Sequence, residues 1–229
     1  DWAHNLSFED EEIDKERGVV IEEWRLGQGA NMRMINKQLP IILQGSKYAQ
    51  RLPIGKKAVL DTFQHQTPKE FYSKWYKPDL MAVIAVGDFE KPAIEGLIQQ
   101  YFSNIPSLPN PTQRPEIPVP DHDETLFAIA SDPEASYSNV SLIYKFDIDE
   151  DKVSILAFRN SIVFKLYNGM LNNRLDELTK TADPPFLYVM SRKGSWVQSK
   201  EMYTLTAYVK TNGIPRGLEA LLTEATRVQ

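Results

Sequence analysis

Glu16 and Glu23 are the two residues of this sequence whose type and spacing best suit chemistry. They are the first and last residues of the stretch ERGVVIEE (residues 16–23), which is predicted to be helical. Seven positions are nearly two helical turns, so both carboxylates would lie on one face about 10 Å apart along the axis. One could bind a metal ion directly while the other orients a ligand from the outer shell. The alternative is a solvated acidic face, as charged residues are mostly exposed and an acidic run precedes the pair.

Other metal-binding side chains are scarce in this sequence. Cysteine is absent, which excludes disulfides and thiolate sites, and the only histidines are His4, His65 and His122. They stand about sixty residues apart, so no two of them share a helical turn. We therefore expect no complete zinc centre within these residues. His65 directly precedes a helix start and is interpreted as a surface histidine.

The composition indicates a folded protein and excludes some partners. Apolar residues make up 42% and charged residues 25% of the 229 residues, close to the averages for globular proteins. The net charge is -5 and the basic residues do not cluster, which argues against nucleic-acid binding. We expect no membrane span, because no apolar run is long enough, and the acidic start is not a signal peptide.

The elements that must position these residues can be read along the first half of the chain. A helix is predicted from residue 7 to about 30, with Ser7 and Asp10 forming a capping box. Residues 31–55 lack periodicity and are interpreted as an irregular connection. A second helix begins at Thr67, and the continuous apolar run 80–86 predicts a strand buried on both faces. A third helix carries apolar residues from Ile94 to Phe102 at helical spacing.

A proline-rich linker is predicted at residues 106–122, with six prolines between positions 106 and 120. Such a segment is stiff and extended, and it divides a first domain, 1–105, from a second, 123–229. In the second domain we expect strands at 125–131, 140–146, 186–198 and 201–210. A long helix is predicted at 150–181, and another begins near Pro215. The pattern indicates an α+β fold, with antiparallel sheets and helices packed on one face.

The stretch DKERGVVIEE (residues 14–23) resembles the distal metal-ligand segment of the pitrilysin/insulinase family of zinc peptidases, the inverzincins. The resemblance implies that Glu23 is the third zinc ligand and Glu16 an accompanying, auxiliary carboxylate. The family's other zinc ligands and its catalytic glutamate belong to an H-x-x-E-H segment, which this sequence lacks. Residues 67–88 are similar to the family's helix, turn and strand ending Gly-Asp. Residues 172–188 look like the next homologous domain, closest to the bacterial, PqqL-like branch.

The resemblance carries expectations about fold, activity and location. It implies the metallohydrolase fold shared with LuxS and the mitochondrial processing peptidase. It also implies a zinc-dependent metalloendopeptidase acting on peptides or unfolded polypeptides, in the bacterial periplasm or cell envelope. The chain would be an internal piece that is inactive and does not retain zinc. A homo-oligomer, or pairing with homologous domains of the same chain, is expected.

Two other readings remain open, together with the role of one tyrosine. A non-catalytic homologue would keep the fold as a peptide-binding or structural subunit, and an unrelated binding module would make the Glu16/Glu23 spacing accidental. Tyr188 could fill a substrate-binding tyrosine role known in the family. The arginine that accompanies that role is missing, because Thr179, Lys180 and Thr181 stand at the matching place. We interpret Tyr188 as a packing residue of a strand.

Overall fold

The computed structural model of the chain describes residues 2–107, 113–149, 151 and 153–228. It divides into two compact units, one made of Asp1–Gly27 and Leu52–Pro115, the other of Gln28–Arg51 and Glu116–Gln229. Residues 108–112 of the predicted linker lie outside the described residues. The assignment of 1–105 and 123–229 to two homologous domains stays a prediction. The structure adds that residues 28–51 belong with the second unit.

The first unit is built from helices. Its elements are α1 (Asp10–Leu26), α3 (Lys57–Thr62), α4 (Gln66–Trp75), the short 3-10 helix η2 (Pro78–Leu80) and α5 (Lys91–Phe102). The predicted helices near residues 7–30, 67 and 94–102 are confirmed. The capping box at Ser7 is wrong, because α1 begins after Glu9, which makes no side-chain capping bond. Among the described residues of this unit, Ile13 is the single buried hydrophobic side chain.

The strand predicted at 80–86 is not formed in this structure. The segment runs beyond η2 without a strand assignment, and its side chains face solvent, with Ile84 83% and Val86 93% exposed. A strand exists only through hydrogen bonds to a neighbouring strand, and no strand is assigned among the described residues of this unit. An apolar run of this kind predicts a buried segment, but it does not show whether a neighbouring strand is present to pair with it.

The second unit contains a three-stranded antiparallel sheet. Its strands are β1 (Ser138–Asp147), β2 (Tyr188–Val197) and β3 (Lys200–Val209), in the order β1-β3-β2. Leu205 on the central strand β3 is paired with Leu142 of β1 on one side and with Ser191 of β2 on the other. The predicted strands at 140–146, 186–198 and 201–210 are confirmed. The strand predicted at 125–131 is wrong, because that segment joins no ladder among the described residues.

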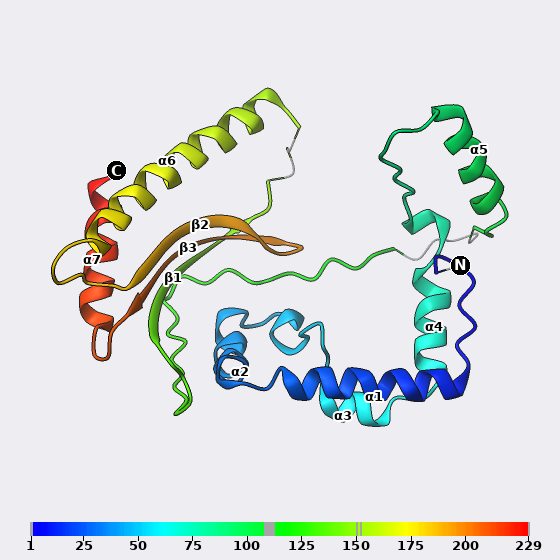
Figure 1. Cartoon of the computed structure of the whole chain (residues 1–229), viewed down its shortest axis with the longest axis horizontal. Helices are drawn as coiled ribbons and strands as arrows, with labels where there is room; N and C mark the ends of the chain where they lie inside the picture. The colour runs from blue at the N-terminus through cyan, green and yellow to red at the C-terminus, as the bar shows by residue number, and fades with distance from the viewer. Residues whose placement is uncertain (1, 108–112, 150, 152, 229) are drawn as a thin grey trace. The chain divides into compact units, whose positions relative to one another are not determined.

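Helices α6 (Ile155–Thr179) and α7 (Ile214–Arg227) pack against the sheet (Figure 1). The α6 helix begins where the Ser154 hydroxyl accepts a hydrogen bond from the Ala157 amide at 3.0 Å, the usual role of serine at an N-cap. The core formed by these helices and β3 consists of buried apolar side chains: Leu171, Leu175, Phe186, Leu205, Ala207, Val209 and Leu221. The α+β class, with an antiparallel sheet and packed helices, is confirmed.

Residues 31–55, predicted to be irregular, contain helix α2 (Ala30–Ile42) and the 3-10 helix η1 (Lys47–Gln50). Proline disfavours helix interiors, yet Pro40 lies inside α2. Contacts within the second unit stabilise this helix: Arg33 donates two 2.7 Å bonds to the carboxylate of Asp132, and Gln38 donates to the Ala128 carbonyl. Within the described ranges, no helix has the length and apolar character needed to cross a bilayer.

Candidate functional site

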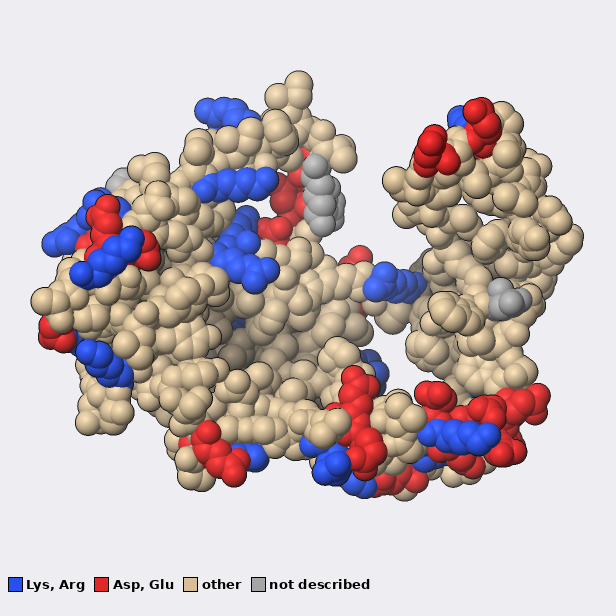
Figure 2. Space-filling view, viewed as in Figure 1, with Lys and Arg blue, Asp and Glu red and all other residues tan. Residues whose placement is uncertain are grey.

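Helix α1 carries both of the predicted site carboxylates. Its first turn is acidic, with Asp10, Glu11 and Glu12, and the helix dipole favours negative charge at that end. Figure 2 shows acidic side chains gathered along this helix, with basic ones among them. The helix therefore carries many carboxylates, and they differ in whether a basic side chain is paired with them.

Glu16 and Glu23 differ from the other acidic residues of α1 in having no side-chain partner among the residues that the structure describes. Both side chains are exposed, and among the described residues neither makes a hydrogen bond or ion pair. The remaining acidic residues of the helix are each paired with a cation on α1 or α4: Asp10, Glu11, Glu12, Asp14 and Glu22. The two carboxylates that share a helix face are therefore the two that remain available to a ligand.

The described part of the chain does not contain a complete metal centre. No three His, Cys, Asp or Glu side chains in it come together in a way that could hold a metal ion. The donor chemistry of Glu16 and Glu23 still fits zinc, because an unpaired carboxylate oxygen is an ordinary zinc ligand. What these residues offer is a partial ligand set.

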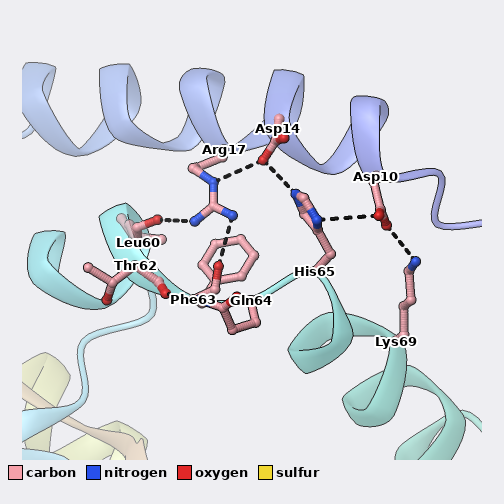
Figure 3. Close-up of polar contacts among 9 residues, drawn as sticks. All are labelled: Asp10, Asp14, Arg17, Leu60, Thr62, Phe63, Gln64, His65 and Lys69. Carbon is pink, nitrogen blue, oxygen red and sulfur yellow. Dashed lines mark hydrogen bonds and ion pairs between the residues drawn. The ribbon is translucent and has the colours of Figure 1, made fainter.

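Arg17 holds α1 against the last turn of α3 and the residue that follows it (Figure 3). Its guanidinium donates from Nη1 to the Leu60 carbonyl at 2.6 Å and from Nη2 to the Phe63 carbonyl at 2.9 Å. The same group lies 3.8 Å from the centre of the Phe63 ring, a cation–π geometry. Leu60 belongs to the last turn of α3, whose carbonyls lack intrahelical partners. Only 16% of the Arg17 side chain is exposed.

A second group of contacts joins α1 to the start of α4 (Figure 3). His65 Nε2 lies 2.9 Å from the Asp14 carboxylate, and Lys69 donates to Asp10 at 2.6 Å. The bond from His65 lowers the pKa of Asp14, and the bond from Lys69 lowers the pKa of Asp10. His65 lies at the surface, as expected, with 35% of its side chain exposed, but its ring also contacts two carboxylates of α1, which the sequence did not predict.

Tyr188 lies in the second unit, at the start of β2. Its side chain is exposed, its ring packs at 5.7 Å from that of Tyr208, and its hydroxyl contacts the Met190 sulfur at 3.9 Å. Thr179, at the end of α6, and Thr181 bond to nearby backbone carbonyls, and Lys180 pairs with Asp176. The ring of Tyr188 contacts Tyr208, but 57% of the residue is exposed, so its packing role stays a prediction.

Two features of these sites were not predicted from the sequence. Arg17 stands inside the stretch that drew attention to Glu16 and Glu23, but its carbonyl partners lie 43 and 46 residues away. The pairing of His65 with Asp14 likewise spans 51 residues. Helical spacing shows which residues share a face, whereas it does not show what a distant loop places against that face.

Comparison with known proteins places the chain in a family. Residues 62–196 match the family described as "Peptidase M16 inactive domain"; Glu16 and Glu23 lie before the matched region. A protein of Arabidopsis thaliana named "Zinc protease PQQL-like" is 36% identical over 187 residues, which is 81% of this chain and 20% of the relative. Escherichia coli "Probable zinc protease PqqL" is 30% identical over 181 residues, covering 76% of this chain and 19% of that protein. The chain thus spans about a fifth of the length of these curated relatives.

Solved structures show the same fold. The first half of the periplasmic protease PqqL from Escherichia coli superposes with a TM-score of 0.82 at 24% identity, over 97% of this chain and 47% of that one. A protease from Helicobacter pylori gives a TM-score of 0.72 at 18% identity, over 96% of this chain and 52% of the other. These likenesses show the fold. The family match, which spans more than half of the chain, shows that the chain belongs to the M16, pitrilysin/insulinase, family of peptidases.

Proposed function

We propose that this chain is part of a zinc-dependent metalloendopeptidase that hydrolyses peptides or unfolded polypeptides. The observation that carries the proposal is the pair of exposed carboxylates, Glu16 and Glu23, which have no side-chain partner within the described ranges, in a chain whose relatives are named zinc proteases. Glu23 is the proposed third zinc ligand. Glu16, seven residues earlier on the same helix face, is the proposed accompanying carboxylate.

Each of these residues would have a defined task. Zinc, when bound, polarises a scissile carbonyl and lowers the pKa of a bound water. Glu23 would hold the ion through a carboxylate oxygen, and Glu16 would orient a neighbouring ligand, as outer-shell groups do. The two histidines and the general base of the family belong to an H-x-x-E-H segment, which does not occur in these 229 residues. The chain alone is therefore proposed to be inactive and to bind zinc weakly.

A second candidate is a non-catalytic homologue that binds peptides or supports an active partner. The description of the matched family as an inactive domain favours it for residues 62–196. This match begins after α1 and covers residues 62–115 of the first unit and 116–196 of the second, so it does not include Glu16 and Glu23. The two readings differ in the zinc content and cleavage activity of the full-length protein.

A periplasmic location is proposed on the likeness to a protease titled periplasmic. The relative at 36% identity comes from a plant, so family membership alone does not set the compartment. Pairing of this chain with homologous domains is proposed on the same family likeness.

The test is a Glu23→Gln substitution in the full-length protein, compared with Glu22→Gln as a matched control on the same helix. Glu22 is exposed and pairs with Arg25, so its loss removes one negative charge without touching the proposed ligand. We expect Glu23→Gln to abolish zinc retention after dialysis and the cleavage of an unfolded polypeptide, while Glu22→Gln keeps both. Zinc retention and turnover unchanged in Glu23→Gln would refute the ligand assignment. A wild-type protein without zinc or cleavage would establish the non-catalytic reading.

A further inference from the structure

Arg17 follows Glu16 directly, yet its side chain is directed elsewhere. Successive helix residues are about 100° apart, so Arg17 projects about 110° around the axis from the shared direction of Glu16 and Glu23. Its guanidinium contacts the Leu60 carbonyl, the Phe63 carbonyl and the Phe63 ring, and its Nε lies 3.4 Å from the Asp14 carboxylate on the same helix. Arg17 thus does not belong to the exposed face of α1 that carries Glu16 and Glu23. It attaches a different side of the helix to the neighbouring segment, and this contact determines the direction in which the exposed face points.

The other described contacts of α1 constrain its rotation less tightly. Ile13 is the single buried hydrophobic side chain among the described residues of its unit, and Val20 and Ile21 are only partly buried, so apolar packing defines the rotation loosely. The contacts of Asp10 and Asp14 with Lys69 and His65 involve carboxylates that are more than half exposed, and exposed ion pairs constrain geometry weakly. The guanidinium of Arg17 is planar, mostly buried and bonded in two directions, which defines an orientation as well as a position.

A small rotation of α1 would matter for a metal ligand. A side-chain tip about 6 Å from the helix axis moves about 1 Å for every 10° of rotation. Groups that act on a metal or substrate must be held to within about 0.5 Å. Rotation of α1 by 10° would therefore displace the Glu16 and Glu23 carboxylates by more than metal binding tolerates.

We propose that Arg17 is a positioning residue that sets the rotation of α1, and with it the direction of Glu16 and Glu23, by clamping the helix to Leu60 and Phe63. This inference rests on the proposed function, in which Glu23 ligates zinc. Arg17 itself would touch neither metal nor substrate. Lysine should replace it poorly, because one ammonium group cannot make both bonds and cover the ring.

The rotation can be measured without metal in the 229-residue chain. The sequence has no cysteine, so Val19→Cys and Val59→Cys, at exposed positions on α1 and α3, can carry a pair of spin labels. Arg17→Met keeps an apolar stem and removes the donors, and we expect it to broaden the distance distribution between the labels. Arg25→Met is the control, since Arg25 is exposed on the same helix and pairs with Glu22; its distribution should match that of the parent chain.

The consequence for the metal is measured in the full-length protein by chelator competition and by the spectrum of the cobalt-substituted form. We expect Arg17→Met to lower zinc affinity about 10–100-fold, as changes outside the first shell do, and to alter the cobalt spectrum. Arg17→Lys should recover part of the loss, and Arg25→Met should stay within about twofold of wild type. Should Arg17→Met not fold, Arg17→Lys and Phe63→Leu carry the test with the same expected direction.

The outcomes separate the inference from the function on which it rests. Unchanged label distances, or unchanged zinc affinity and cobalt spectrum in folded Arg17 variants while Glu23→Gln loses zinc, would overturn the role of Arg17 and leave the ligand assignment standing. Zinc retention by Glu23→Gln would overturn the ligand assignment, and the positioning role with it.

Discussion

The side-chain amide of Asn172 makes both hydrogen bonds that a neighbouring strand would make to Ser191. Its Nδ2 donates to the Ser191 carbonyl at 2.9 Å, and its Oδ1 accepts from the Ser191 amide at 2.7 Å. Since β2 is an edge strand in the order β1-β3-β2, these backbone groups face away from the sheet. Asn172, on α6, thus closes the middle of an edge that would otherwise be open to strand addition.

Ser191 is the buried centre of a wider polar network. The residue is 3% exposed, and its hydroxyl contacts Asn168 Oδ1 at 2.5 Å and the Tyr203 hydroxyl at 2.9 Å. Burial raises the pKa of Tyr203 to about 12, so this phenol keeps its proton at neutral pH and remains a donor. The network joins α6 to β2 and β3 through partly buried side chains that surround the buried Ser191.

We predict that Asn172→Ala destabilises the second unit by about 2–3 kcal/mol, because it leaves the buried amide and carbonyl of Ser191 without partners. Asn173→Ala is the matched control: the side chain next along the same helix is exposed and should cost less than about 0.5 kcal/mol. Urea unfolding followed by circular dichroism measures both. Equal midpoints for the two variants would show that water or a rearranged strand satisfies Ser191.

The sequence predicts those elements whose own residues show the periodicity of a strand or a helix. The alternation of Val140, Leu142, Tyr144 and Phe146 indicated β1, and the strand is formed over Ser138–Asp147. The segment 80–86 was predicted on equally good apolar content and is not a strand, because ladder bonds depend on a partner that its composition does not encode. In the same way, α2 forms around Pro40 because residues 128–132 hold it by side-chain bonds.

Two helix glycines in the second unit should respond to alanine in opposite directions. A Cβ at Gly217 would lie 2.6 Å from Cγ1 of Val209, whose side chain is fixed in the core, whereas a Cβ at Gly169 meets nothing within 4 Å. Alanine favours a helix by up to about 1 kcal/mol over glycine, and overpacking costs about 1–3 kcal/mol. We therefore predict a net loss for Gly217→Ala and a gain for Gly169→Ala in urea unfolding. A gain in both would mean that α7 shifts freely on β3.

The candidate site was predictable only in part, for a related reason. The spacing of Glu16 and Glu23 follows from helical geometry, and both carboxylates do lie exposed on α1. That Asp10, Asp14 and Glu22 have cationic partners while Glu16 and Glu23 do not depends on where α4 and Arg25 place their charges. The sequence identifies the acidic residues of the helix, but the surrounding fold determines which of them are paired with a cation and which can bind a ligand.

The ion pair between Arg33 and Asp132 should make the second unit sensitive to acid. The bond from Arg33 lowers the pKa of Asp132 to about 2, from 3.8. A depressed carboxyl pKa means that the unfolded chain binds the proton more readily, so the stabilisation is complete above about pH 4 and is lost as pH falls toward 2. We predict that the difference in Tm between wild type and Asp132→Asn is constant near neutral pH and shrinks between about pH 4 and 2.

Arg33→Met provides the matched comparison for this prediction. It removes the partner of Asp132 together with the contacts of Arg33 to Glu134 and the Gln28 carbonyl. Its Tm difference from wild type should therefore also shrink toward low pH, and the double variant should add little to Arg33→Met. Melting curves from pH 7 to 2 measure all three. A Tm difference for Asp132→Asn that does not change with pH would contradict the assignment of the pH dependence to this pair.

Glu16 and Glu23 should differ in how strongly each affects zinc in the full-length protein. If Glu23 is the ligand and Glu16 orients a neighbouring group, Glu16→Gln should weaken zinc binding by about 10–100-fold, whereas Glu23→Gln should abolish it. Glu12→Gln is the control, because Glu12 lies on the same helix and is paired with Lys15; it should change affinity less than about twofold. Competition with a chromophoric chelator measures the three dissociation constants. A Glu16→Gln loss as complete as that of Glu23→Gln would assign both carboxylates to the metal, and equal, small losses in all three would reduce the pair to part of a solvated acidic face.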